Sequence, residues 1–148
     1  MTSKPGPTFK FNIEELSSFS YENVKLSLTS TYLYSDLKDL CFEYNVIVDR
    51  DEVGVLTALI NEDQNLYRVE GNIGLTIERA AMNKAIPYKV VKAIFPLYKH
   101  FKQDKVTITT NKEDGSVSRM CLDLNGKFLD VVNSDNDEKH FRYIIPCK

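Results

Sequence analysis

Hydrophobic positions follow two different periods along the chain. Two early segments, residues 36–44 and 51–62, carry apolar side chains at helical spacing, with Ser35 and either Asp49 or Asp51 available as N-cap residues. Alternation of apolar and polar residues predicts strands at 9–13 and 24–28, and an apolar run at 46–48 suggests a short strand or a linker. The first half is therefore expected to combine short strands with helices.

The segment TIERAAMNKAIPYKVVKAI, residues 76–94, predicts a pair of helices. Thr76 is suited to cap the first helix, over 76–84. Pro87 occupies the favoured first position of the second helix, which should end or kink at Pro96. The two helices would meet at a short turn around Ala85.

The last third of the chain favours strands. Candidate strands lie at residues 106–110, 116–124, 128–132 and 140–145, and Asn125-Gly126 predicts a tight hairpin. We therefore expect an α+β fold, with N-terminal and central helices followed by a three- or four-stranded antiparallel C-terminal meander. After a flexible lead-in at 1–8, residues 9–148 are expected to form one compact domain, with a 9–48 extension, a 51–124 core and an additional hairpin at 125–148.

Composition excludes several classes of protein. Of 148 residues, 43% are hydrophobic and 27% are charged, which fits neither a disordered chain nor a membrane protein. No secretory signal precedes the first predicted strand, so a cytoplasmic location is expected. Three scattered cysteines without a CxxC pair, and only two histidines, predict neither disulfides nor a metal site, and no motif indicates a cofactor.

Charge is distributed unevenly. Residues 1–78 carry 6 basic and 13 acidic side chains, whereas residues 79–103 carry 6 basic side chains and no acid. A basic block in an acidic protein is typical of a surface that contacts phosphates. A solvated helix face, or a docking site for the acidic half, would give the same pattern.

The segment 76–103 resembles a helix-turn-helix, because small and apolar residues fall where two such helices would cross and lock. Together with its surroundings, residues 51–124 are similar to the winged-helix family of DNA-binding domains, with TTNKEDGSV as the wing. The resemblance implies a transcription-regulator-like protein, possible as a homodimer, that binds double-stranded DNA. Its implied nucleic-acid contacts are Arg79, Lys84, Tyr88, Lys89, Lys92, Lys99, Lys102 and Lys112.

No catalytic motif is present, so the sequence predicts a non-enzymatic protein. The acids at 49–52 are interpreted as a helix N-terminus. The alternative function is that of a small phage or viral protein that binds a host protein and inhibits or redirects it. An exposed edge of the C-terminal sheet would then pair with that partner.

Overall fold

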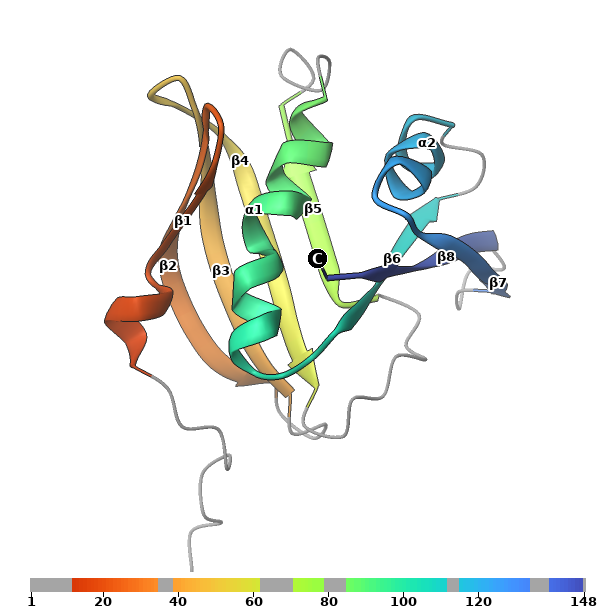
Figure 1. Cartoon of the computed structure of the whole chain (residues 1–148), viewed down its shortest axis with the longest axis horizontal. Helices are drawn as coiled ribbons and strands as arrows, with labels where there is room; N and C mark the ends of the chain where they lie inside the picture. Colours follow the sequence, from red (N-terminus) through yellow and green to blue (C-terminus); the bar gives the residue numbers. More distant parts are fainter. Residues whose placement is uncertain are drawn as a thin grey trace, which may run out of the picture.

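The structure is a computed structural model that describes residues 12–34, 39–61, 71–78, 85–111, 115–133 and 139–147. These residues form an eight-stranded sheet with two α-helices and one short 3-10 helix (Figure 1). The strands are β1 (Ser18–Tyr21), β2 (Val24–Tyr34), β3 (Asp39–Val48), β4 (Asp51–Asn61), β5 (Ile73–Ile77), β6 (Lys105–Asn111), β7 (Lys127–Asn133) and β8 (Lys139–Pro146). The helices are η1 (Ile13–Leu16), α1 (Ile86–His100) and α2 (Gly115–Asp123).

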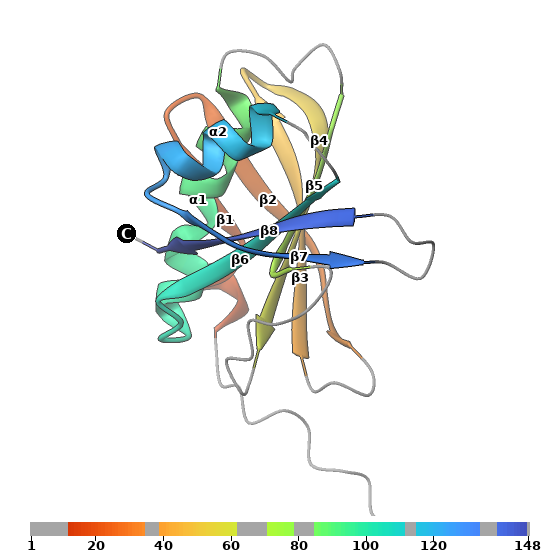
Figure 2. The same cartoon turned by 90° about the vertical axis from the view of Figure 1, so that its right-hand side faces the viewer.

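The strands lie in the order β1-β2-β3-β4-β5-β6-β8-β7. In the described part of the chain, neighbouring strands are antiparallel except for β5 and β6, which are parallel. Helix α1 forms the crossover between these two parallel strands. Figure 2 shows β6, β8 and β7 running across the direction of β3, β4 and β5, so the sheet changes direction at the parallel pair.

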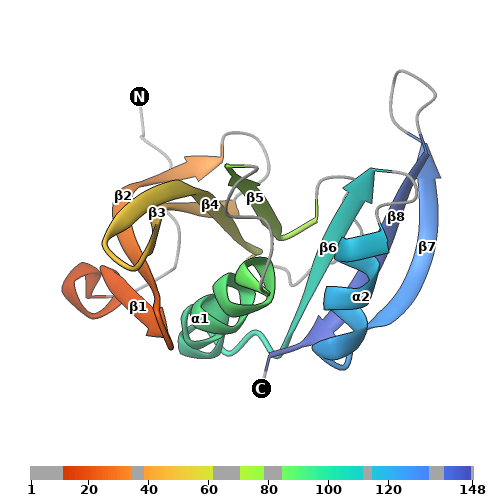
Figure 3. The same cartoon turned by 90° about the horizontal axis from the view of Figure 1, so that it is seen from above.

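Both α-helices pack on the same face of the sheet. Helix α1 lies inside the curve formed by β1 to β5 (Figure 3) and contacts β1, β2 and β4. Helix α2 packs on β6 and β8, where its Ser118 meets Tyr143. Tyr143 is the register partner of Ile108, and Ile108 is the partner of Ile73, which packs in the same core as α1. The register therefore places α2 on the face that α1 covers.

Helix α1 is held by a broad apolar stripe. Its buried residues are Ile86, Val90, Val91, Ala93, Ile94, Phe95, Leu97 and Tyr98. Pro87 begins the helix as predicted, but the helix does not end at Pro96, which is exposed within it. Burial of Leu97 and Tyr98 in the core stabilises the end of the helix. This stabilisation exceeds the cost of the backbone hydrogen bond that Pro96 cannot make. None of the helices in the described ranges is long and apolar enough to span a membrane.

The two helices expected at 36–44 and 51–62 are wrong, because the described residues of these segments belong to β3 and β4. In β3, Leu40, Phe42 and Tyr44 alternate into the core, but Cys41 on the opposite face is also buried. In β4, Leu59 is buried in the same way. Burial on both faces of a central strand removes the alternation that identifies a strand, and the apolar run then matches helical spacing by chance.

The strand expected at 116–124 is a helix, α2, and Asn125-Gly126 ends this helix instead of joining a hairpin. Asn125 has a φ of 63°, and the Gly126 N–H donates to the Cys121 oxygen over 2.8 Å. Helices commonly end in this way, with a residue in the left-handed region and the next N–H bonded to a carbonyl of the last turn. The same φ preference supports a type I′ turn, so the dipeptide alone could not separate the two structures.

The predicted winged-helix fold and C-terminal meander are therefore both wrong. Thr76 and Ile77, expected in a helix, lie in β5, and residues 79–84 fall outside the described residues. The expected wing contains the end of β6 and the start of α2, while 112–114 are likewise outside the described part. Strands do form over 106–110, 128–132 and 140–145, but β8 lies between β6 and β7, so they do not make a meander.

Candidate functional site

The main break in the sheet lies between β5 and β6. Only one residue pair, Ile73 with Ile108, is in parallel register between these strands in the described ranges. Beyond that pair the two strands diverge toward their carboxyl ends (Figure 1). Open sheets with parallel strands bind ligands outside the carboxyl ends of such strands, where the connections leave a crevice. We use the name β5–β6 cleft for this divergence of the two strand backbones beyond the Ile73–Ile108 pair.

The backbone of β5 directs polar groups into the cleft. The Glu78 N–H donates to the Val53 oxygen, and the Leu59 N–H donates to the Asn72 oxygen, each over 2.8 Å. Successive residues of a strand direct their backbone groups to opposite sides. Leu75 and Ile77 therefore point their N–H and C=O groups toward β6, and no strand in the described part of the chain is paired with them on that side. These groups can accept an extended ligand as an added strand.

Asn72 closes the other end of the cleft. Its own N–H donates to the Thr107 oxygen of β6 over 2.8 Å, so this N–H cannot serve the β4 ladder. The Asn72 side chain supplies the missing donor, because Nδ2 donates to the Leu59 oxygen over 3.1 Å. Its Oδ1 accepts the Thr107 N–H over 2.9 Å and the Thr107 hydroxyl over 3.1 Å. The Tyr98 hydroxyl of α1 donates to the Asn72 oxygen over 3.1 Å. We call these contacts the Asn72 clamp.

Gly71 brings the chain to the clamp. Its φ of 74° lies in the left-handed region, and a Cβ at this position would stand 2.9 Å from the Thr107 oxygen. Glycine is therefore the residue that allows both the turn and the close approach to β6. The clamp and its glycine fix the point at which β5 and β6 separate.

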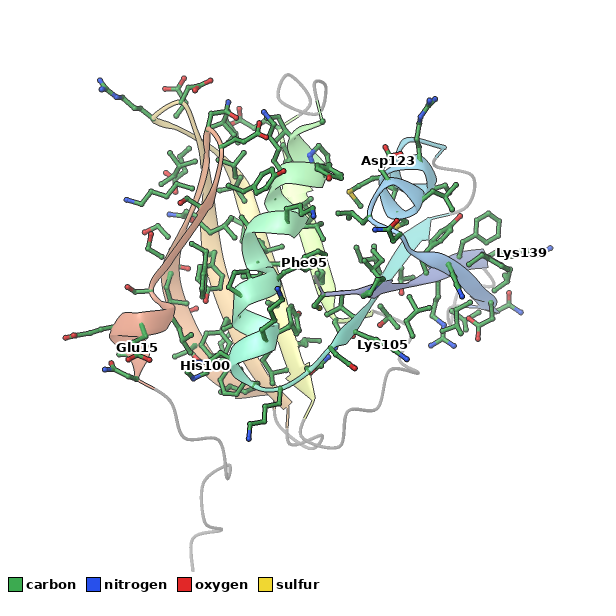
Figure 4. All side chains as sticks on the ribbon, viewed as in Figure 1. Glu15, Phe95, His100, Lys105, Asp123 and Lys139 are labelled. Carbon is green, nitrogen blue, oxygen red and sulfur yellow. The ribbon has the colours of Figure 1, made fainter. Side chains whose placement is uncertain are left out.

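A pocket of about 480 Å³ lies at the open end, between the first turn of α1 and α2. It is lined by Ala85, Pro87, Tyr88, Val117, Arg119, Met120 and Asp123. Asp123 lies on the side of α2 that faces α1 (Figure 4). Ala85, the N-cap residue of α1, makes no side-chain cap hydrogen bond, and the first turn of the helix carries no acidic residue. The positive end of the helix dipole is thus available to an anionic ligand.

The first turn of α1 is anchored by the turn between β1 and β2. The Lys89 ammonium forms an ion pair with Glu22 over 3.1 Å and donates to Asn23 Oδ1 over 2.9 Å. The Tyr88 ring contacts Tyr21 edge to face, with ring centroids 6.4 Å apart. These contacts orient Tyr88, whose ring reaches the pocket.

Hydroxyl groups of α2 and β8 meet near the closed end of the cleft. Ser118 Oγ and Tyr143 OH lie 2.6 Å apart. Since Tyr143 pairs with Ile108, this hydroxyl pair is one strand away from the point at which the cleft closes. Either hydroxyl can donate the shared hydrogen bond, and the pair can relay a proton.

The cysteines do not provide a nucleophile. Desolvation by burial raises the pKa of Cys121 and of Cys147 to about 12, and burial also raises the pKa of Cys41 above its usual range. All three thiols are buried and free. A thiolate is the reactive form of cysteine, so these residues are inert at neutral pH.

The structure separates the residues predicted to bind nucleic acid. Tyr88 lines the pocket, whereas Lys89 is paired with Glu22 and its side chain is only 21% exposed. Lys92 lies over the Tyr88 ring, 6.0 Å from its centroid. Lys99 lies in the last turn of α1 and Lys102 follows the end of this helix, so both are at the other end of α1 from Tyr88. The other predicted residues, outside the described ranges, are Arg79, Lys84 and Lys112.

No sequence pattern indicates Asn72, Ser118 or Tyr143 as site residues. Their positions depend on pairing between β5, β6 and β8, which lie far apart along the chain. One local signal was present: Gly71 precedes IGLTI at 73–77, and a glycine before an alternating apolar segment favours a strand with a close backbone approach.

Comparison with known proteins finds matches of structure only. No family model matches the sequence, and no curated protein matches it. Similar solved structures include a ribosomal-protein-S5-alanine acetyltransferase from Vibrio fischeri, with a TM-score of 0.64 and 10% identity over 88% of this chain and 97% of that one. The microcin C7 self-immunity acetyltransferase MccE, solved with acetyl-CoA and AMP, has a TM-score of 0.56 and 12% identity over 72% of this chain.

A chimera of the Vibrio cholerae spermidine N-acetyltransferase SpeG and hSSAT matches with a TM-score of 0.57 and 8% identity, over 77% of this chain and 68% of that one. The chain spans 61% of the MccE structure. At these identities the likeness shows a shared fold, that of the GNAT acetyltransferases.

This fold overturns the predicted function. The similar structures are acetyltransferases, so the resemblance to winged-helix DNA-binding domains is wrong, and with it the double-stranded DNA partner. The prediction of a non-enzymatic protein and the alternative of a viral inhibitor of a host protein are wrong on the same ground. The absence of catalytic motifs misled because a fold held together by strand pairing is not recorded in any short motif.

Proposed function

We propose that the protein is an acyltransferase that moves an acetyl group from acetyl-CoA to an amine. The observations that carry this proposal are the β5–β6 cleft, which is closed by the Asn72 clamp, and the pocket between the first turn of α1 and α2. A cleft of this form offers separate places for the three parts of a coenzyme A thioester, namely the nucleotide, the pantetheine arm and the acyl group.

The nucleotide end belongs in the pocket. Its phosphates meet the uncapped N-terminus of α1, and Arg119 on α2 supplies a cation among the lining residues. Tyr88 presents a ring to the same space.

The pantetheine arm follows β5. Its amides can pair with the backbone groups of Leu75 and Ile77, which point into the cleft. This pairing directs the thioester toward the closed end of the cleft. Backbone N–H groups that line the cleft are also suited to stabilise the negative oxygen that forms in acyl transfer.

The chemical step needs a neutral amine and a departing thiol. The amine nitrogen attacks the thioester carbonyl carbon, the C–S bond breaks, and the product is an amide. The amine loses one proton and the coenzyme A sulfur gains one. The Ser118–Tyr143 hydroxyl pair is the group that we assign to deliver the proton to the sulfur.

Calorimetric titration with acetyl-CoA tests this proposal. The wild-type protein should bind one acetyl-CoA, and Arg119→Glu should weaken binding by about tenfold or more, because a charge-assisted contact of about 1.5 to 3 kcal/mol is lost. Lys139→Glu makes the same charge change on β8, away from the pocket, and should leave the affinity unchanged (Figure 4). Absence of binding to the wild-type protein would overturn the proposal.

A further inference from the structure

The closed end of the cleft is an apolar corner. Ile73 of β5 and Ile108 of β6 are register partners, and both side chains are buried in the core on the face that the helices cover. A strand advances about 3.3 Å per residue, so the four steps from Ile77 back to Ile73 span roughly 13 Å. A thioester arm that enters beside α1 therefore meets this isoleucine pair at the end of its path.

The Asn72 clamp lies directly behind this corner. Asn72 is 2% exposed, and its amide connects β4 to β6 as an additional peptide group would. Thr107, its partner on β6, is 1% exposed. A corner backed by buried and mutually satisfied hydrogen bonds is rigid, because moving either strand leaves polar groups without partners.

We propose that the Asn72 clamp makes the Ile73–Ile108 pair a fixed end wall, so that the cleft accepts short acyl groups such as acetyl and rejects longer ones. Asn72 is then a positioning residue for acyl selection. This inference rests on the proposed function. It adds that the acyl-chain limit is set by the hydrogen bonds behind the wall as well as by the isoleucine side chains.

Acyl-chain length gives the direct test. The affinities of wild-type protein for coenzyme A, acetyl-CoA, butyryl-CoA and octanoyl-CoA are measured by calorimetry, and each acyl affinity is divided by that for free coenzyme A. Acetyl-CoA should match coenzyme A, and octanoyl-CoA should bind about tenfold more weakly or worse, which corresponds to at least about 1.4 kcal/mol.

Two variants locate the wall. Ile108→Ala removes its bulk and Asn72→Ser removes the clamp, and each should bring the relative octanoyl-CoA affinity to within about threefold of that for acetyl-CoA. Leu26→Ala is the matched control, since it removes the same atoms from a buried site on β2. It should lower thermal stability without changing the acyl preference. If Asn72→Ser does not fold, Thr107→Val removes one hydroxyl bond of the clamp with little change of shape.

The outcomes separate this inference from the proposed function. Failure of every coenzyme A compound to bind would refute the proposed function. Equal binding of all chain lengths to the wild-type protein would leave the proposed function intact and overturn the end wall. Retention of the short-chain preference in Ile108→Ala and in the clamp variants would show that the limit lies elsewhere. A changed preference in Leu26→Ala would show that loss of stability alone accounts for the effect.

Discussion

Asn72→Ala should destabilise the protein far more than removal of other hydrogen bonds near the cleft. The substitution deletes the amide that joins β4 to β6. It leaves the Thr107 N–H and the Leu59 C=O, both in a buried part of the sheet, without the partner that satisfies them. The backbone bonds of residue 72 remain, so the change tests the side chain alone.

The expected cost follows from those two groups. A buried backbone group that loses its partner costs about 1 to 3 kcal/mol, so Asn72→Ala should lower the free energy of unfolding by about 4 kcal/mol. Tyr98→Phe removes the hydroxyl that donates to the Asn72 oxygen, and this oxygen keeps its bond from the Leu59 N–H. Its cost should be about 1 kcal/mol.

Urea unfolding followed by circular dichroism measures both costs, with the slope m expected to stay constant. Asn45→Ala on β3 is the control, because Asn45 is half-buried and makes no side-chain hydrogen bond among the described residues. It should change stability by less than about 0.5 kcal/mol. The account of the clamp would be refuted if Asn72→Ala cost no more than Tyr98→Phe.

Three further predictions concern other features. Ala85→Gly should raise the melting temperature slightly, because Ala85 has a φ of 62°, in the left-handed region. This conformation costs alanine about 1 to 2 kcal/mol, which is more than the conformational entropy that glycine loses on folding. A lower melting temperature would contradict this prediction. The hydrogen bonds from Arg142 hold the pKa of Asp130 below its usual range, so the ion pair stabilises the fold at neutral pH and is lost as the pH falls through that lowered pKa. The stability difference between wild type and Asp130→Asn should therefore vanish in strong acid, and a constant difference would exclude the pair as its cause. A thiol reagent should label no cysteine in the native protein and all three after unfolding, and rapid native labelling would contradict the burial of Cys41, Cys121 and Cys147.

Local patterns predicted elements where polar residues alternate with apolar ones or where a residue fixes the backbone. Alternation identified the start of β2, and short apolar segments identified the strands over 106–110, 128–132 and 140–145. Pro87 marked the start of α1 correctly. These signals are local, because they depend on the period of a half-buried surface or on the fixed φ of proline.

The same reasoning failed where burial covers both sides of a strand. Cys41 in β3 and Leu59 in β4 are buried on the face opposite the core, and these extra apolar positions produced a helical period. The helix expected over 51–62 also extended the helix-turn-helix resemblance of 76–103 to that of a winged helix. The cleft depends on where β5 and β6 separate, and a single asparagine bound to residues 13 and 35 positions away sets that point. Sequence periodicity contains no information about such contacts.

The most direct test of the central claim is amide hydrogen exchange of Leu75 and Ile77, measured by NMR with and without acetyl-CoA. Both N–H groups point into the cleft, where none of the described strands pairs with them, so they should exchange readily in the free protein. If the pantetheine arm pairs with β5, saturating acetyl-CoA should slow exchange at these two amides, whereas the Thr76 N–H, which faces β4, should change little. Binding of acetyl-CoA without protection of Leu75 and Ile77 would contradict the claim that the β5–β6 cleft holds the cofactor.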